Sequence, residues 1–226
     1  MLSKYFQQAA GDYLWLLEKG YRAGSILELV GNHYQLPATE RSMLYRGIQT
    51  EATRKKRAGK LIFETETLAG KELALDGFNV LIAIASYLQG LPVFIASDNW
   101  LRDAAHLRNK IQKITRFADA IECLLAHLRV LNPGNVLIFL DKKADLHQQL
   151  KDFLLDSAFW EKDRFSIIVS DLVDEDLMAI NSGILCTSDS EIIDHTTCRL
   201  FDLARNTLEN AFRPDFVDMR EFCSPP

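Results

Sequence analysis

From residue 71 onward, short apolar segments alternate with longer segments whose apolar residues recur at helical spacing. Two of the short segments, VLIFL (136–140) and FSIIV (165–169), are apolar without interruption. Strands that alternate with helices predict βαβ units, and uninterrupted apolar strands indicate a sheet that is covered on both faces. We therefore predict an α/β fold for residues 71–226, Rossmann-like and with a mostly parallel sheet.

Several of the apolar segments in this region end in an aspartate. They are ELALD with Asp76, LPVFIASD with Asp98, NVLIFLD with Asp141, FSIIVSD with Asp171 and GILCTSD with Asp189. If the strands are parallel, these side chains meet at the carboxyl edge of the sheet, where open α/β sheets bind ligands. Gathered carboxylates repel one another, and a divalent cation relieves that repulsion. Oxygen ligands without histidine or thiolate predict Mg²⁺ or Mn²⁺ rather than zinc.

Each of these aspartates also has a simpler interpretation. An aspartate after a strand is a common N-cap of the following helix, or a turn residue. Asp98 before NWLRD and Asp141 before KKADL fit that alternative. The pattern alone does not decide between an acidic site and a set of separate caps.

The first 70 residues predict a small all-helical domain. Three segments, DYLWLLEKG (12–20), AGSILELVGNHY (23–34) and LPATERSMLYRGI (36–48), have apolar residues at helical spacing and end near glycine or asparagine. Three short helices with tight turns are typical of a helix-turn-helix-like unit that binds nucleic acid. Small helical bundles share the pattern, so this head could instead pack on the body or pair with a second copy as a homo-oligomer.

A basic run closes the head. Within TRKKRAGK (53–60), the cations are Arg54, Lys55, Lys56, Arg57 and Lys60. Clustered cations neutralise phosphates, so the run predicts contacts with a nucleic-acid backbone, and the alternative is a solvated helix end or linker. Residues 1–70 carry a net charge of +3 and residues 71–226 one of -8. We therefore predict two domains, a helical domain with a basic linker (1–70) and an acidic α/β domain (71–226).

Composition excludes several classes of protein. With 226 residues, 48% hydrophobic and 25% charged, the chain has the profile of a globular protein, and no apolar run reaches the roughly 20 residues that span a bilayer. The amino terminus has no apolar signal core, and the four cysteines form no C-x-x-C pair, which predicts a cytoplasmic protein without a disulfide framework. The motifs of serine hydrolases, dinucleotide-binding folds and P-loops do not occur.

Three motifs resemble those of PIN-like nuclease domains, in particular the NYN branch. DGFNVL resembles the first-strand motif, with Asp76 and Asn79. VDEDLMAI resembles the acidic motif of a middle helix, with Asp174 and Asp176. CTSDSEIIDH resembles the late strand-to-helix motif, which maps to Thr187, Ser188, Asp189 and Asp194. The resemblance covers residues 71 to about 204. The whole chain, with LYRGI in the head and DGFNVLI in the body, resembles a bacterial and archaeal family of unknown function.

The resemblance implies hydrolysis of phosphodiester bonds in RNA with the help of Mg²⁺ or Mn²⁺. Asp76 and Asp189 would hold one or two ions, and Asp174 or Asp176 would bind a second ion or orient water. Asn79 or Ser188 would fix a carboxylate or a phosphate oxygen. Further candidate metal ligands are Asp171, Asp98 and Asp103.

The sequence also departs from the PIN-like pattern. The central strand continues as FLDKK, without the glycine that often follows the aspartate. The segment LPVFIASDNWLRD and the long helix predicted over 109–131 are additional to a minimal PIN-like core. Asp98 and Asp103 in that segment would complete the acidic cluster or only cap the helix. RNA contacts would come from the basic run or from Lys142 and Lys143.

Two other functions remain open at this point. One is a catalytically inactive nucleic-acid-binding or regulatory protein on the same fold. The other is a magnesium-dependent phosphohydrolase of small phosphoesters. The D-x-D-x-T nucleophile motif of haloacid dehalogenases is absent, because Gly77 and Phe78 follow Asp76.

Overall fold

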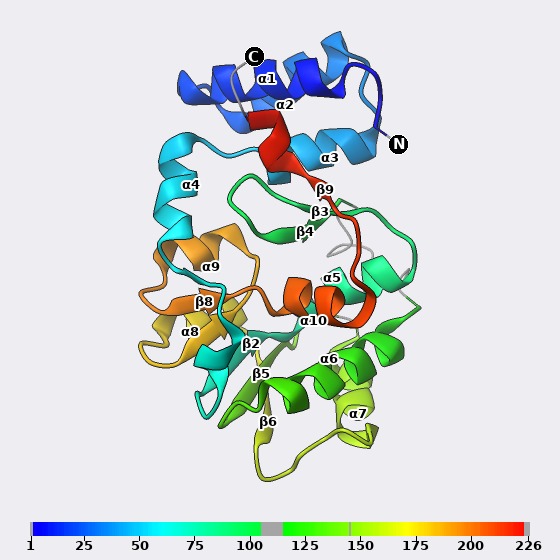
Figure 1. Ribbon diagram of the computed structural model, residues 1–226, viewed down its shortest axis with the longest axis vertical. Helices are drawn as coiled ribbons and strands as arrows, with labels where there is room; N and C mark the ends of the chain where they lie inside the picture. The colour runs from blue at the N-terminus through cyan, green and yellow to red at the C-terminus, as the bar shows by residue number, and fades with distance from the viewer. Residues whose placement is uncertain (1, 105–114, 145, 224–226) are drawn as a thin grey trace. The chain divides into compact units, whose positions relative to one another are not determined.

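The computed structural model describes residues 2–104, 115–144 and 146–223, with Glu66 described by its backbone only. The chain divides into two compact units, which we call unit 1 (residues 1–59, 91–106 and 215–226) and unit 2 (residues 60–90 and 107–214) (Figure 1). None of the helices within the described ranges has the length and apolar character needed to cross a membrane.

The division of the chain differs from the predicted boundary at residue 70. Residues 60–70 belong to unit 2, because β1 (Leu61–Ile62) pairs with β8 (Arg199–Phe201) of its sheet. Residues 91–104 and 215–223 belong to unit 1 and supply a second, smaller sheet. Unit 1 is therefore assembled from segments that lie far apart in the sequence.

Residues 6–58 form the helical part of unit 1. The helices are α1 (Phe6–Glu18), α2 (Ala23–His33), α3 (Ala38–Gly47) and α4 (Glu51–Ala58). The first three confirm the predicted helices, and α4 carries Arg54, Lys55, Lys56 and Arg57 of the basic run. Thr50 caps α4 by accepting a hydrogen bond from the Thr53 N–H at 3.2 Å.

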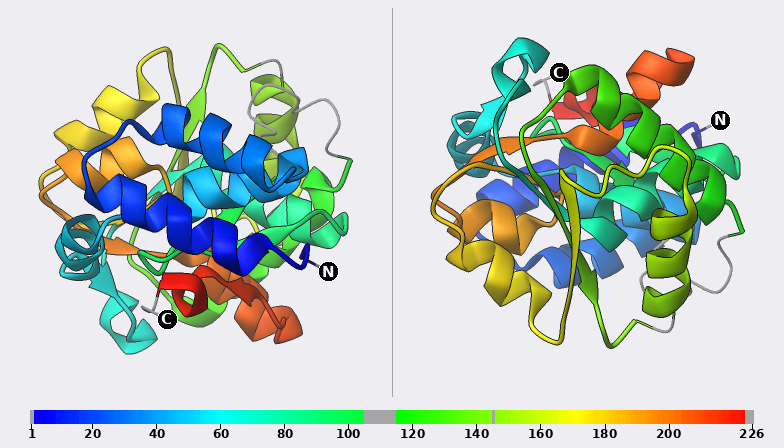
Figure 2. Two further views of the ribbon diagram at one scale, coloured as in Figure 1. Left: turned by 90° about the horizontal axis from the view of Figure 1, so that it is seen from above. Right: turned by 90° about the horizontal axis from the view of Figure 1, so that it is seen from below.

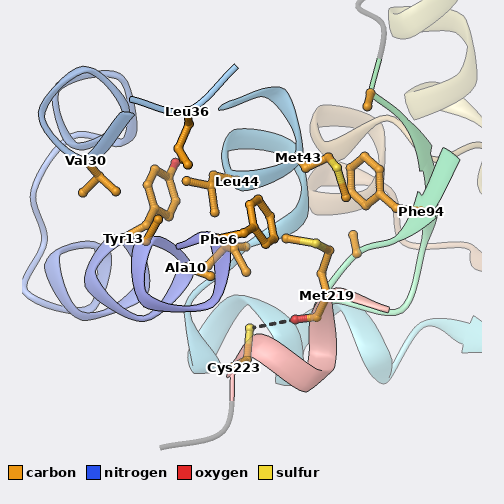
Figure 3. Packing of buried hydrophobic residues seen from close by; sticks show 14 of the residues in the cluster. Phe6, Ala10, Tyr13, Val30, Leu36, Met43, Leu44, Phe94, Met219 and Cys223 are labelled. Carbon is orange, nitrogen blue, oxygen red and sulfur yellow. Dashed lines mark hydrogen bonds between the residues drawn. The ribbon is translucent and has the colours of Figure 1, made fainter. Parts of the chain in front are cut away.

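The remaining segments complete the core of unit 1. Its three-stranded sheet has the order β4-β3-β9, with β4 at Leu101–Asp103, β3 at Val93–Ile95 and β9 at Val217–Asp218. A short 3-10 helix, η4 (Met219–Cys223), follows β9. Figure 3 shows Phe94 and Met219 in the same apolar cluster as Phe6, Tyr13 and Leu44, all of them buried. Apolar burial thus ties the first, middle and last segments together.

Helix α3 does not present the face that a groove-reading helix needs. In a helix-turn-helix protein the second helix lies exposed in the major groove. In α3 only Ala38, Thr39 and Tyr45 are exposed. Arg41 is used within the unit, since its guanidinium donates to the carbonyls of Gly31 (2.7 Å) and Leu36 (2.9 Å). The helical prediction for the head is confirmed, but α3 is an interior helix.

Unit 2 contains a six-stranded sheet in which all pairs are parallel, in the order β1-β8-β7-β2-β5-β6. The bounds of the other strands are Leu73–Asp76 (β2), Val136–Asp141 (β5), Phe165–Ser170 (β6) and Ile184–Cys186 (β7). This confirms the predicted Rossmann-like α/β architecture with a parallel sheet. LPVFIASD does not join it, since β3 lies in the small sheet of unit 1.

Helices cover both faces of this sheet (Figure 2). They are α5 (Gly77–Leu88), α6 (Phe117–Leu131), α7 (His147–Asp156), α8 (Val173–Ala179), α9 (Ser190–His195) and α10 (Leu203–Phe212), with the 3-10 helix η1 (Thr65–Leu68). Helices α5, α6 and α10 pack on one another on one face, and α8 packs on α9 on the other. Residues 109–114 of the predicted long helix lie outside the described residues.

The strand order places a switch point at β2. From β2 the chain adds β5 and then β6 toward one edge, and it then returns to β7 on the opposite side of β2. The segment after β2 begins α5 on one face, and the segment after β7 begins α9 on the other. In open α/β sheets, the crevice between two such carboxyl ends is where ligands bind.

Candidate functional site

Asp76 is the last residue of β2 and lies at this switch point. Its side chain is buried, with 3% of the residue exposed. One carboxylate oxygen, Oδ1, accepts from the backbone N–H of Asn79 (3.2 Å) and caps the start of α5. The other, Oδ2, accepts from the hydroxyl of Thr187 (3.1 Å), which follows β7. These two hydrogen bonds come from neutral donors and offset part of the free energy that it costs to remove the carboxylate from water.

The glycine after Asp76 has a packing reason. A Cβ at Gly77 would lie 2.7 Å from the carbonyl oxygen of Phe139 and 2.8 Å from a methyl carbon of Leu140. Only glycine allows α5 to begin this close to β5. The D-G pair therefore sets both the cap and the approach of helix to sheet.

Asn79, in the first turn of α5, connects the segment after β2 with the segment after β7. Its side-chain oxygen Oδ1 accepts from the Ser188 backbone N–H and from the Ser188 hydroxyl, each at 2.8 Å. Asn79 and Ser188 are part of DGFNVL and CTSDSEIIDH, respectively. The two motifs therefore meet through direct hydrogen bonds.

Thr187 links Asp76 to Asp189. While its hydroxyl donates to Asp76, the same oxygen accepts from the backbone N–H of Asp189 (3.0 Å). Asp189 caps α9, because its Oδ1 accepts from the Glu191 N–H at 2.9 Å. Asp76, Asn79, Thr187, Ser188 and Asp189 form one connected cluster, which we call the switch-point cluster.

The structure places two further aspartates of unit 2, Asp141 and Asp171, along the same edge of the sheet. Asp141 ends β5, beside β2, and its Oδ1 accepts from the Lys143 N–H at 2.8 Å. Asp171 follows β6 and pairs with Lys142 at 3.4 Å, with 56% of the Asp171 side chain exposed. These two lie on the carboxyl edge, but in loops that are more open to solvent than Asp76.

Asp202 also follows a strand of this sheet, although it was not among the predicted site residues. It follows β8, is buried, and caps α10 by accepting from the Arg205 N–H (3.0 Å). It lies close to Cys186 of β7, where burial raises the pKa of the thiol and the charge of Asp202 raises it further. The signal was present in RLFDLARN, because an aspartate again separates an apolar strand from a helix.

The predicted metal ligands Asp98 and Asp103 have a different role. They lie in unit 1, whereas the switch-point cluster lies in unit 2. Asp98 is 2% exposed, and both of its oxygens are held by arginines, with Arg57 at 2.6 Å and Arg102 at 2.6 and 2.8 Å. Asp103 pairs with Arg46 at 2.6 Å. Both carboxylates are thus neutralised by guanidinium groups within their own unit, which corrects the prediction.

The candidate acids of the middle motif lie in the first turn of α8. Asp174 and Asp176 are both half-buried. Helix α8 packs against β2 and β5, which brings this motif to the strand that carries Asp76. These two residues remain candidates for the same site.

The donor set of the cluster suits a hard cation that keeps its waters. Among the described residues, no three His, Cys, Asp or Glu side chains are grouped so that they could hold a metal ion together. A closed protein cage is therefore not formed by the described side chains. Mg²⁺ commonly keeps several waters and takes one or two carboxylates, and the pair Asp76 and Asp189 with hydroxyl groups beside them fits that type of site.

The predicted basic run is partly used inside the protein. Arg57 is buried on Asp98. The Lys60 ammonium donates to the carbonyls of Ile193 (2.7 Å), Asp194 (3.4 Å) and Thr196 (2.7 Å), at the carboxyl end of α9. These two cations are structural, which corrects the prediction that they contact phosphates. The exposed cations of the run are Lys55 and Lys56, and Lys55 pairs with Glu51 at 2.5 Å.

Comparison with known proteins gives relatives whose descriptions state no activity. Residues 65–206 match the family model described as Domain of unknown function (DUF5616), and residues 5–60 match that of a Protein of unknown function (DUF434). The uncharacterized protein MJ0935 of Methanocaldococcus jannaschii is 29% identical over 208 residues, which are 90% of this chain and 96% of that protein. No solved structure matches the chain.

Proposed function

The chain belongs to the family described as Domain of unknown function (DUF5616), and since this description names no activity, we propose from the site itself that unit 2 is a metal-dependent nuclease that hydrolyses phosphodiester bonds in RNA. One observation carries the proposal. The strand order brings Asp76 and the Thr187–Ser188–Asp189 segment together at the switch point, and hydrogen bonds join them. The resemblance of both motifs to PIN-like nuclease domains supports the same activity.

In this proposal Asp76 and Asp189 hold the cation, and the other residues of the cluster orient them. Thr187 fixes the carboxylate of Asp76 and the backbone of Asp189 through one hydroxyl. Asn79 holds Ser188 by accepting from its backbone N–H and its hydroxyl, and the side-chain NH₂ of Asn79 is the group of this pair that can donate to a phosphate oxygen. When bound, Mg²⁺ or Mn²⁺ lowers the pKa of water and stabilises charge on phosphoryl oxygens. Asp174 or Asp176 orients the attacking water from α8.

The test is cleavage of a mixed pool of labelled RNAs with Mg²⁺ or Mn²⁺. Asp76→Asn and Asp189→Asn are expected to lose at least about 100-fold in rate, because even residues that only support a metal ligand cost about 10–100-fold. Asp163→Asn is the matched control, since it makes the same change in charge at an exposed position before β6. Cleavage that persists in both site variants, or that needs no metal, contradicts the proposal.

A second candidate is a catalytically inactive nucleic-acid-binding or regulatory protein on the same fold. It is favoured by the absence, within the described part of the chain, of three metal-ligating side chains in one place. RNA binding without cleavage under any metal, together with no Mn²⁺ binding by calorimetry, would favour this candidate. A parallel screen of small chromogenic phosphoesters tests the remaining alternative, a small-molecule phosphohydrolase.

A further inference from the structure

We propose that Lys142 and Lys143 form a phosphate-binding subsite, beside Asp76 on the carboxyl edge of the sheet, that takes a second phosphate of a polynucleotide. This inference rests on the proposed function in taking a phosphodiester chain as the ligand. It adds the class of substrate, because a ligand that needs both the switch-point cluster and this subsite must carry at least two phosphates.

The backbone of these lysines is fixed from both sides. The Lys142 N–H donates to the Ser170 carbonyl at 2.9 Å, which continues the pairing of β5 with β6. The Lys143 N–H donates to the Asp141 carboxylate at 2.8 Å. Both residues are exposed, with 59% of the Lys142 side chain accessible to solvent. A short, anchored loop therefore presents two ammonium groups to solvent.

The register of the sheet sets how far this loop lies from Asp76. Asp76 pairs with Phe139 of β5, so Lys142 lies three residues beyond the level of Asp76. Three residues of strand span about 10 Å at roughly 3.3 Å each. Lysine ammonium groups at that distance suit a phosphate that flanks the one at the switch-point cluster. A small phosphoester has no such second phosphate.

The present partner of Lys142 is easily replaced. Its ammonium lies 3.4 Å from Asp171, and both side chains are more than half exposed. Exposed ion pairs of this kind contribute little to stability, because water and salt screen them. A phosphate that approaches the edge can therefore take over Lys142 at little cost, and release of counterions from the phosphate favours the exchange.

The experiment measures binding of a labelled single-stranded RNA oligonucleotide by fluorescence anisotropy, with the full chain and with EDTA in place of metal. Lys142→Gln/Lys143→Gln is compared with Lys71→Gln/Lys162→Gln, which removes two exposed lysines ahead of β2 and β6, at the opposite edge of the same sheet. We expect at least a tenfold weaker Kd for the first variant. We also expect its slope of log K against log salt to fall by about 1.4, since each phosphate contact on a single strand contributes about 0.7.

Single-stranded DNA of the same sequence forms a second arm. Equal loss with DNA is expected, because the lysines contact phosphates and not the 2′-hydroxyl. No RNA binding by the wild type, or equal losses in the two double variants, would overturn the subsite. Because binding is measured without metal, its outcome is separate from cleavage. If cleavage depends on Asp76 but the double lysine variant binds RNA as tightly as the wild type, only the subsite is overturned. If binding depends on the two lysines but no RNA is cleaved, only the proposed hydrolysis is overturned.

Discussion

Both units bury an aspartate after a short apolar strand, but the two side chains have opposite surroundings. In unit 1, Asp98 is 2% exposed and accepts from the guanidinium groups of Arg57 and Arg102 at 2.6 Å. In unit 2, Asp76 is 3% exposed and accepts from a backbone N–H and from the Thr187 hydroxyl. The two side chains are buried to nearly the same extent, but these donors are positively charged at Asp98 and neutral at Asp76.

This difference separates a structural carboxylate from a candidate functional one. Burial raises the pKa of Asp98, but the positive charges and hydrogen bonds of Arg102 and Arg57 lower it, and the net shift is downward. The negative charge of Asp98 is thus matched within its own unit. The Asn79 N–H and the Thr187 hydroxyl, which orient Asp76, are neutral groups, and such donors position a carboxylate without adding positive charge beside it.

The sharpest test of this comparison is the same substitution at both positions. Asp98→Asn is expected to lower the free energy of unfolding by about 3–5 kcal/mol, because it leaves two buried arginines without a full counter-charge. Asp76→Asn is expected to change it by about 1 kcal/mol or less, since asparagine caps helices about as well as aspartate. Urea unfolding of the full chain measures both values. Equal losses at the two positions would end the distinction that we draw.

The pH dependence of stability provides a related test. Because the pKa of Asp98 is lower in the folded protein, its contribution to stability is complete above the unfolded pKa of about 3.9 and is lost as the pH falls through the folded value. We therefore expect the difference in unfolding free energy between wild type and Asp98→Asn to be constant from neutral pH down to about pH 4 and to shrink below it. Because other carboxylates titrate in both proteins, most of their effects on stability cancel when the two unfolding free energies are subtracted. A gap that instead widens toward acid would mean that Asp98 has a raised pKa.

The sequence predicted the parallel sheet because each of its strands can be recognised locally. Alternating strands and helices determine the class of fold, and the D-G pair and the motif asparagine mark the switch point. The same local pattern occurs in LPVFIASD, yet β3 joins the other sheet. Strand pairing is a long-range choice, which apolar composition alone does not encode.

The sequence did not predict which segments of the chain form unit 1, for the same reason. Phe94 and Met219 pack with Phe6 across most of the length of the chain. Arg57 belonged to a run of surface-type cations, and only its tertiary partner Asp98 explains why it is buried. The ionic partners of a residue cannot be inferred from its neighbours in the sequence, and so Asp98 and Asp76 looked alike.

A smaller effect is expected from Thr187→Val. The hydroxyl of Thr187 both donates to Asp76 and accepts from the Asp189 N–H, and valine keeps the shape while it removes both bonds. We expect a loss of about 1–2 kcal/mol in unfolding free energy, as for buried hydrogen bonds generally. Thr67→Val is the control, because the Thr67 hydroxyl bonds the Glu64 carbonyl at an exposed site. Similar losses in the two variants would mean that Thr187 has no special place between the aspartates.

The smallest effect is expected at Asp171, which represents a third kind of surroundings for a strand-ending aspartate. Its charge is neither matched by buried arginines nor held by neutral donors in the interior, but faces water and Lys142. Asp171→Asn should therefore change the unfolding free energy by less than about 0.5 kcal/mol. Because the substitution frees Lys142, we also expect RNA to bind slightly more tightly in the anisotropy assay. A large loss of stability, or weaker RNA binding, would show that exposure at the sheet edge does not separate Asp171 from Asp76, and a role of Asp171 as a metal ligand would then be the first to test.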